Sequence, residues 1–202
     1  VSEELWVPMG AEENACFTID SAGYALADGG FNACLRDYAR LGLVYFNDGY
    51  WNGRRIVPAE WVADVRRGDH GLFNDEARTF LPNGQYRNQF WIEDADRESF
   101  LAQGVFGQMI YVSPEKEMVV AKLSTWPDFV NRDYTRHTLR AIDAIAAALR
   151  CSKQQTYWRN SVPDLDLCYF SAAEALARFQ PTPLSPAYPL AAVLPPSAEV
   201  PP

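Results

Sequence analysis

The chain has 202 residues, of which 48% are hydrophobic, and its 26 acidic residues outnumber its 18 basic ones to give a net charge of −8. This size and apolar fraction are typical of one folded domain, which excludes collagen-like, coiled-coil and wholly disordered proteins. Because the chain has no basic cluster and no apolar run near the roughly 20 residues of a bilayer span, we expect neither a nucleic-acid partner nor a membrane partner.

Two elements are predicted in the first part of the chain. Residues 15–20, Ala-Cys-Phe-Thr-Ile-Asp, are a strand candidate that ends at Ser-Ala-Gly. Between 35 and 46 apolar residues recur at helical spacing, which predicts an amphipathic helix with one buried stripe, ended by Asn-Asp-Gly. The helix start is capped either by Asn32 or by Cys34, which has Asp37 three residues later. That is a capping-box spacing with a weak thiol in the place of Ser or Thr.

Turn and loop signals occupy the middle of the chain. Trp-Asn-Gly-Arg at 51–54 predicts a tight turn, and Pro58 suits the first position of a short helix that runs through Val65. Residues 67–85 are polar and contain glycine, as is typical of a surface loop. A lone histidine in such a loop, His70, is most simply a solvated side chain.

A sheet and a long helix are predicted after this loop. Strand-like runs at 86–93, 100–112 and 118–125, with a polar loop of hairpin length at 113–117, predict an antiparallel meander. A final helix over 132–150 is predicted to lie across the sheet with one apolar side. That side consists of Leu139, Ile142, Ala146 and Leu149.

Composition changes abruptly near Arg150. All 12 glycines precede this residue, whereas nine of the 14 prolines follow it. We therefore divide the chain into a domain at 1–150 and a Pro-rich, Gly-free and largely disordered extension at 151–202, with one short helix predicted at 171–179. Two alternatives are a Pro-rich ligand for the aromatic groove of a partner protein and a tail read out of frame.

The spacing of cysteine and histidine does not indicate a metal site. Cys16, Cys34, Cys151 and Cys168 form no Cys-x-x-Cys pair, and the histidines at 70 and 137 have no Cys or His neighbour at ligand spacing. We therefore expect no metal and no cofactor, and the pairing of the cysteines in disulfides is left open.

Three short strings imitate the motifs of serine hydrolases that combine Ser-x-x-Lys at a helix start with Tyr-x-Asn and a Lys-Thr-Gly strand. Ser113 and Lys116 have the first spacing, but a loop between two strands does not put them on one helix face, as proton transfer between them requires. The Tyr-x-Asn spacing recurs at 86–88, where it opens a strand, and at 45–47, where it closes a helix. We expect all three strings to be structural.

Gly104 and Gly107 lie inside the strand-like run 100–112. Glycine weakens a strand, so its presence indicates either that something approaches the backbone closely or that the strand bulges there. Both interpretations remain open from the residues alone.

Six strings occur in an order typical of one family. They are Leu-Trp-Val-Pro-Met-Gly at 5–10, Asp-Ser-Ala-Gly at 20–23, Gly-Gly-Phe-Asn-Ala at 29–33, Arg-Asp-Tyr-Ala-Arg-Leu-Gly at 36–42, Gly-Arg-Arg-Ile-Val-Pro at 53–58 and Gly-Gln-Met-Ile-Tyr-Val at 107–112. Through these strings residues 1–150 resemble the C-terminal part of a β-lactamase-related, penicillin-binding-protein-like serine hydrolase. They are most similar to its 6-aminohexanoate-dimer hydrolase branch.

The resemblance implies an α+β fold, an antiparallel sheet flanked by helices, as a partial β-lactamase/transpeptidase-like fold that lacks its N-terminal portion. Val105, Phe106 and Gly107 stand in the place of Lys-Thr-Gly, so the Gln108 N–H would complete the oxyanion hole, and Gly104 adjoins this implied substrate-binding edge. Such a donor contributes about 3–4 kcal/mol of transition-state stabilisation. Val105 departs from the pattern because it offers no cation to a substrate carboxylate, which favours neutral amide or ester substrates. Phe106 is either an apolar wall of the pocket or core, since in a strand only one of Val105 and Phe106 faces the pocket.

By the order of the family's motifs, the catalytic Ser-x-x-Lys and Tyr-x-Asn would precede Val1, so we expect no nucleophile in this chain. One hypothesis is the C-terminal portion of a serine hydrolase that cleaves amide or ester bonds of a small molecule through an acyl-enzyme and is inactive as this chain. The other is a non-catalytic binding module derived from the same fold. The compartment stays open, because a chain that starts at Val1 shows nothing about a leader peptide.

Overall fold

The computed structural model describes residues 1–26, 29–68, 73 and 75–154, which all belong to one unit of the chain. The helix predicted at 171–179, most of the predicted Pro-rich extension and His70 lie outside these described residues.

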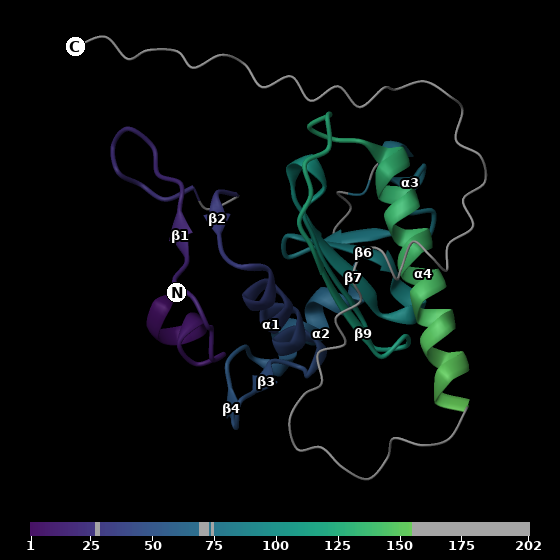
Figure 1. Ribbon diagram of the computed structural model, residues 1–202, viewed down its shortest axis with the longest axis horizontal. Helices are drawn as coiled ribbons and strands as arrows, with labels where there is room; N and C mark the ends of the chain where they lie inside the picture. The colour runs from purple at the N-terminus through teal and green to yellow at the C-terminus, as the bar shows by residue number, and fades with distance from the viewer. Residues whose placement is uncertain (27–28, 69–72, 74, 155–202) are drawn as a thin grey trace. The chain divides into compact units, whose positions relative to one another are not determined.

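Helices and short strands make up this unit, as Figure 1 shows. The helical elements are η1 Ser2–Trp6, α1 Leu35–Phe46, α2 Ala59–Arg67, α3 Asp75–Arg78, η2 Ala95–Arg97, η3 Val105–Gly107 and α4 Arg132–Gln154. The strands are β1 Cys16–Phe17, β2 Phe31–Asn32, β3 Tyr50–Trp51, β4 Arg54–Arg55, β5 Gln85–Arg87, β6 Phe90–Asp94, β7 Ser99–Gln103, β8 Met109–Ser113 and β9 Met118–Lys122. An antiparallel sheet flanked by helices confirms the predicted α+β class.

Strands β5 to β9 form one antiparallel sheet in the order of the sequence, which confirms the predicted meander. In its centre Tyr111 of β8 stands between Leu101 of β7 and Val120 of β9. The polar loop predicted at 113–117 connects β8 to β9, and β9 ends at Lys122 rather than near 125.

The middle of the chain differs from the prediction in two places. The run predicted as one strand at 86–93 is a hairpin, β5 and β6, because Asn88 and Gln89 have φ values of 50° and 69°, the left-handed values of a tight two-residue turn. The segment predicted as a surface loop at 67–85 contains α3 and the buried Leu81, which belongs to the hydrophobic core. Leu81 gives that segment an apolar anchor that its polar composition does not indicate.

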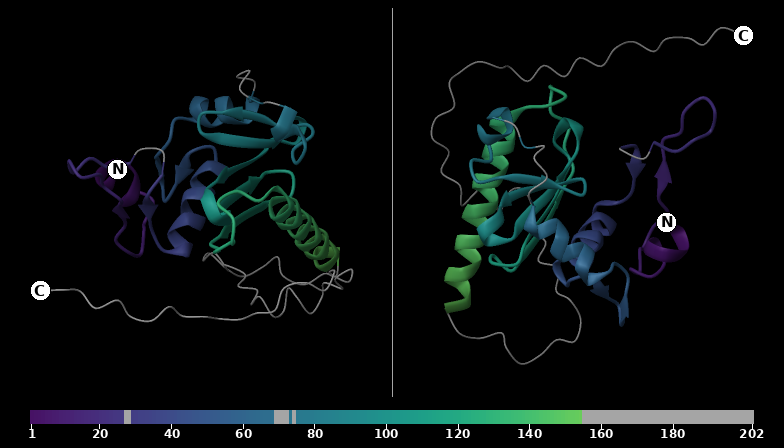
Figure 2. Two further views of the ribbon diagram at one scale, coloured as in Figure 1. Left: turned by 90° about the horizontal axis from the view of Figure 1, so that it is seen from above. Right: turned by 180° about the vertical axis from the view of Figure 1, so that it is seen from behind.

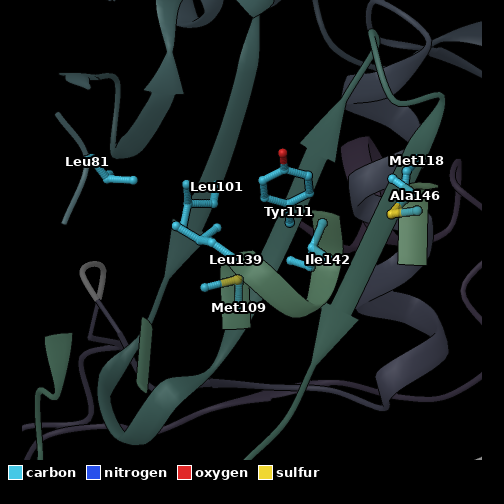
Figure 3. Close-up of a cluster of buried hydrophobic side chains, with 8 residues drawn as sticks. All are labelled: Leu81, Leu101, Met109, Tyr111, Met118, Leu139, Ile142 and Ala146. Carbon is cyan, nitrogen blue, oxygen red and sulfur yellow. The ribbon is translucent and has the colours of Figure 1, made fainter. Parts of the chain in front are cut away.

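Helix α4 covers one face of the sheet, and α1 together with α2 covers the other (Figures 1 and 2). Alternate residues of a strand point to opposite faces, so Tyr111 packs on the α4 side whereas Val112 packs with α1 and α2. The α4 face is held by the cluster drawn in Figure 3: Leu81, Leu101, Met109, Tyr111, Met118, Leu139, Ile142 and Ala146. The apolar side predicted for the last helix is therefore confirmed, and that helix continues to Gln154.

Helix α1 begins where Cys34 takes the N-cap position, which decides between the two predicted caps. The thiol does not cap a backbone N–H; it donates to the Asp37 carboxylate, with Sγ and Oδ2 3.1 Å apart. The same buried carboxylate accepts the N–H groups of Glu12 at 2.9 Å and Glu13 at 3.1 Å, which ties the amino-terminal segment to α1. Burial raises the pKa of the Asp37 carboxyl, but these donors together hold it below its ordinary value.

Gly42 brings the middle of α1 against the sheet. A Cβ at this position would lie 2.5 Å from Cγ1 of Val119 and 3.0 Å from Cγ2 of Ile110. Only glycine fits this approach without a shift of the Val119 side chain. The helix predicted at 35–46 is thus confirmed. The close approach of the sheet explains why its buried stripe contains a glycine.

The strand predicted at 15–20 shrinks to β1, which pairs with β2. Residues 18–26 are exposed throughout, and Tyr24 leaves 74% of its surface in contact with solvent. By contrast, Trp6 and Met9 before this excursion are buried in a cluster with Val44 of α1. The amino-terminal residues are therefore anchored by buried side chains, whereas residues 18–26 bury none.

The short elements after α1 follow the prediction closely. Asn52 and Gly53 form the turn between β3 and β4, with φ values of 52° and 78°. Pro58 precedes α2 as its N-cap residue, one position before the predicted one.

Candidate functional site

The residues that the sequence singles out form a tight turn, here called the 104–108 turn, between β7 and β8. The continuous strand predicted at 100–112 is therefore wrong, because η3, Val105–Gly107, interrupts it. Phe106 and Gly107 have φ values of 54° and 85°, in the left-handed region that strands do not use.

Gly107 decides between the two interpretations of the glycines in favour of a close approach. A Cβ on Gly107 would lie 2.3 Å from Cε2 of Trp126 and 2.6 Å from Oγ of Ser124. The approaching groups belong to the segment that follows β9, so Gly107 allows that segment to lie directly against the 104–108 turn.

Val105 and Phe106 both present their side chains to solvent, with 42% and 41% of their surfaces exposed. The strand alternation from which we expected at most one of the two to face the pocket is absent here, because a turn replaces the strand, and which of them faces a pocket stays a prediction. Phe106 is also not a core residue. Its ring packs edge-to-face on Phe129, with ring centroids 5.6 Å apart and planes at 82°.

Backbone hydrogen bonds fix the turn. Gly104 N–H donates to the Gln108 carbonyl at 2.9 Å and Phe106 N–H to the Phe129 carbonyl at 2.9 Å. The Gln108 N–H faces the Val105 carbonyl at 3.4 Å, longer than the roughly 2.7–3.2 Å of an ordinary N–H···O bond. This weak bond leaves the Gln108 N–H able to exchange its acceptor for a better one, and its oxyanion role stays a prediction.

The Gln108 side chain fastens the turn to the segment after β9. Its amide Nε2 donates to the Ser124 carbonyl at 2.6 Å, and its Oε1 accepts the Ser124 N–H at 3.0 Å. This pair of bonds resembles one rung of a sheet ladder, made by a side chain instead of a strand.

Lys122 is the polar residue of this site that sequence reasoning missed. Its Nζ donates to the Gly107 carbonyl at 2.8 Å and to Oγ of Ser124 at 2.6 Å, and it lies 4.5 Å from the centre of the Trp126 ring. Burial lowers the pKa of the Lys122 ammonium below its ordinary value. Val105 brings no cation to the turn, but Lys122 does so from the neighbouring strand.

A sequence signal for Lys122 exists once the hairpin is recognised. A hairpin closed at 113–117 places position 122 opposite 109, two residues after Gly107. Lys122, Ser124 and Trp126 then follow at spacing two, which directs alternate side chains of an extended segment to one side.

The structure gives the surroundings of the three strings that imitate catalytic motifs. Oγ of Ser113 accepts the backbone N–H of Lys116 at 3.3 Å, while the Lys116 ammonium contacts other groups. Those contacts are Tyr111 Oη at 2.6 Å, Asp143 at 2.8 Å and Glu93 at 3.5 Å. Ser113 and Lys116 thus form no nucleophile and base pair. The Tyr-x-Asn string at 45–47 ends α1, as predicted, whereas the string at 86–88 ends β5 and does not open a strand.

A cavity of about 260 Å³ lies away from the 104–108 turn, beside α4. Its charged lining comprises Glu93, Asp94, Arg97, Lys116, Arg136, Arg140 and Asp143. None of the residues of the 104–108 turn lines this cavity.

Within residues 1–26, 29–68, 73 and 75–154, no three His, Cys, Asp or Glu side chains gather as a metal site. Of the helices described, none is both long and apolar enough to cross a membrane. Cys16 and Cys34 are free thiols.

The fold and the comparisons with known proteins indicate the class: the chain resembles a partial region of a β-lactamase-like hydrolase. More particularly, it is 34% identical over 130 residues to the 6-aminohexanoate-dimer hydrolase of Paenarthrobacter ureafaciens, a match of 63% of this chain and 33% of that protein. A solved structure of a Bacillus anthracis protein, whose title assigns it provisionally as a 6-aminohexanoate-dimer hydrolase, is 31% identical to this chain in sequence. The two structures superpose with a TM-score of 0.63. That match covers 74% of this chain and 38% of the other.

These similarities confirm the resemblance indicated by the six strings. The chain spans between 33% and 38% of the length of the relatives it matches. No protein-family model matches the chain.

Proposed function

We propose that this chain is part of a serine hydrolase that cleaves amide or ester bonds of small molecules through an acyl-enzyme. The 104–108 turn would form the oxyanion and substrate-binding edge of its site. The observation that carries the proposal is an exposed turn with a weakly bonded Gln108 N–H, in a chain similar to a hydrolase named for a 6-aminohexanoate dimer.

In acyl transfer, a serine oxygen adds to the substrate carbonyl carbon and the carbonyl oxygen becomes an anion. Backbone N–H groups aimed at that oxygen stabilise it, and the leaving group departs with a proton before water releases the acyl group. The Gln108 N–H supplies one such donor in this proposal. Val105 and Phe106, both exposed at the turn, supply apolar contact for the substrate.

The nucleophile, its lysine and the catalytic tyrosine are proposed to come from polypeptide outside residues 1–202. Ser113 and Lys116 are unsuitable because their side chains are not paired. The 202-residue chain should therefore show no burst with a nitrophenyl ester and no serine labelled by a fluorophosphonate. Saturable turnover that Ser113→Ala abolishes would overturn the proposal.

The oxyanion role has a sharper test in the longer protein, if the reading frame before the Val1 codon encodes Ser-x-x-Lys and Tyr-x-Asn. Gln108 has φ −64° and ψ 141°, a conformation that proline adopts, so Gln108→Pro removes the N–H without forcing this residue's own φ. Gln108→Ala is the matched control, because it removes the same side-chain bonds to Ser124 but keeps the N–H.

We expect kcat of the proline variant to fall about 100- to 1,000-fold below that of the alanine variant, the usual effect of losing one oxyanion donor. Equal kcat values for two folded variants would exclude the Gln108 N–H from the oxyanion hole. An upstream frame without the catalytic motifs would instead support the non-catalytic binding module.

A further inference from the structure

We propose that Lys122 is a positioning residue: through the Gly107 carbonyl it orients and polarises the Gln108 N–H. The inference rests on the proposed function in one respect, namely that the Gln108 N–H donates to the oxyanion of the substrate. The link from Lys122 to the peptide group stands on the geometry of the turn.

The Gly107 carbonyl and the Gln108 N–H are the two ends of one planar peptide unit, in which they point in opposite directions. Two donors hold the carbonyl end, Lys122 Nζ at 2.8 Å and Ser124 Oγ at 2.8 Å. With its oxygen held from one side, the peptide cannot rotate freely, so its N–H is directed away from Lys122.

A charged donor does more than orient the peptide. Charge-assisted hydrogen bonds are about twice as strong as neutral ones, and hydrogen bonds in series polarise each other. An ammonium on the Gly107 oxygen therefore draws electron density from the peptide nitrogen and makes the Gln108 N–H a better donor. Ser124, which is neutral, cannot supply this effect alone.

Among the described residues, the Lys122 ammonium has no carboxylate counter-ion. Its ammonium is bounded by the Gly107 carbonyl, by Oγ of Ser124 at 2.6 Å and by the face of Trp126 at 4.5 Å. A carboxylate beside the ammonium would neutralise its charge and weaken its effect on the peptide. The aromatic face stabilises the cation and leaves its charge uncompensated.

Other titratable groups on the neighbouring segments have contacts of their own or are exposed. Asp133 pairs with Arg136 at 3.1 Å, and Asp128 accepts the side-chain amide of Asn131 at 2.8 Å. The Tyr134 ring packs on Trp126, with centroids 5.5 Å apart, and His137 is exposed on α4. Among the described residues, Lys122 is the charged donor to the Gly107 carbonyl, so a pH response of this peptide that disappears in Lys122→Met is assigned to Lys122.

The test is a carbon-detected NMR titration of the ¹³C,¹⁵N-labelled 202-residue chain. The cross-peak that joins the Gly107 carbonyl carbon to the Gln108 nitrogen reports on this one peptide and does not vanish through amide exchange. From neutral pH to about pH 11 we expect it to shift with an inflection below the ordinary lysine pKa of 10.5, because burial lowers the pKa of Lys122.

Three variants assign the inflection. Lys122→Met is expected to displace the cross-peak and abolish its pH dependence, whereas Lys122→Arg keeps a charge that does not titrate in this range. Lys116→Met is the matched control, since Lys116 lies in the same hairpin but bonds to Tyr111, and it should leave the inflection in place.

A wild-type cross-peak that does not move with pH, or the same inflection in Lys122→Met, would overturn the inference. The wild-type titration alone gives the first result, so the test does not depend on a variant that folds. The titration also does not require the chain to hydrolyse a substrate. A positive titration with equal kcat values for Gln108→Pro and Gln108→Ala would keep the link to Lys122 and reject only the oxyanion role.

Discussion

Replacing Gly42 by alanine tests how closely α1 lies on the sheet. In an exposed helix this change would stabilise the protein by about 1 kcal/mol, because alanine has the higher helix propensity. Here the new methyl group would meet Cγ1 of Val119 at 2.5 Å and Cγ2 of Ile110 at 3.0 Å. Overpacking of this kind costs about 1–3 kcal/mol, and a β-branched side chain has few rotamers available for relief. We expect a net loss of about 1 kcal/mol in the free energy of unfolding.

The assay is urea unfolding of the 202-residue chain, followed by tryptophan fluorescence, for Gly42→Ala, Val119→Ala and the double variant. Val119→Ala removes the methyl group with the shortest contact. In that background Gly42→Ala is expected to be neutral or stabilising, which corresponds to a coupling energy of about 1–3 kcal/mol. Additive single effects, or a stabilising effect of Gly42→Ala in the wild-type background, would refute the close contact.

Asp37→Asn is expected to lower the free energy of unfolding by about 2–4 kcal/mol, because an amide replaces a buried carboxylate that accepts the Glu12 N–H. The pKa of Asp37 lies below its ordinary 3.8, so its stabilising contribution is present above that pH and is lost as the pH falls through the folded value. In acid, the free energy of unfolding of the variant should not show the fall caused by protonation of Asp37. The same fall in the variant and in the wild type would contradict this prediction. Burial and then Glu93 raise the pKa of Tyr111 and the Lys116 ammonium opposes them, so that the pKa is raised to about 12. In an NMR titration Lys116→Met should therefore move the Tyr111 pKa upward; a downward shift would exclude this contact.

The meander and its two helices could be predicted because their signals are local. Apolar residues at helical spacing define α1, and four apolar residues at such spacing define the side of α4 that packs on Tyr111. Asn52 and Gly53 carry a turn signal that does not depend on the rest of the chain. Such elements keep the structure that their own residues favour.

The 104–108 turn could not be predicted, since its cause lies elsewhere in the sequence. Phe, Leu, Ile, Tyr and Val dominate the run 100–112 and favour a continuous strand. The break at Val105–Gly107 is stabilised by Trp126 and Ser124, which follow β9. The turn is thus a product of tertiary contacts that local propensity does not show.

The role of Lys122 was missed for a related reason. Its hydrogen bond joins residues 15 positions apart, and no motif of short spacing records it. Only the register of the β8–β9 hairpin brings the ammonium to the Gly107 carbonyl. Residues that contact a glycine-containing turn can be identified only after the register of the neighbouring strands is known.

The bonds from Glu12 and Glu13 to Asp37 determine what happens when the exposed excursion between β1 and β2 is cut. A protease that cleaves within 18–26 meets exposed residues, while the peptide before the cut stays attached through Trp6, Met9 and that carboxylate. The nicked molecule would migrate as two fragments on a denaturing gel and as a single particle in native buffer. Its first residues would behave as a bound peptide ligand of α1.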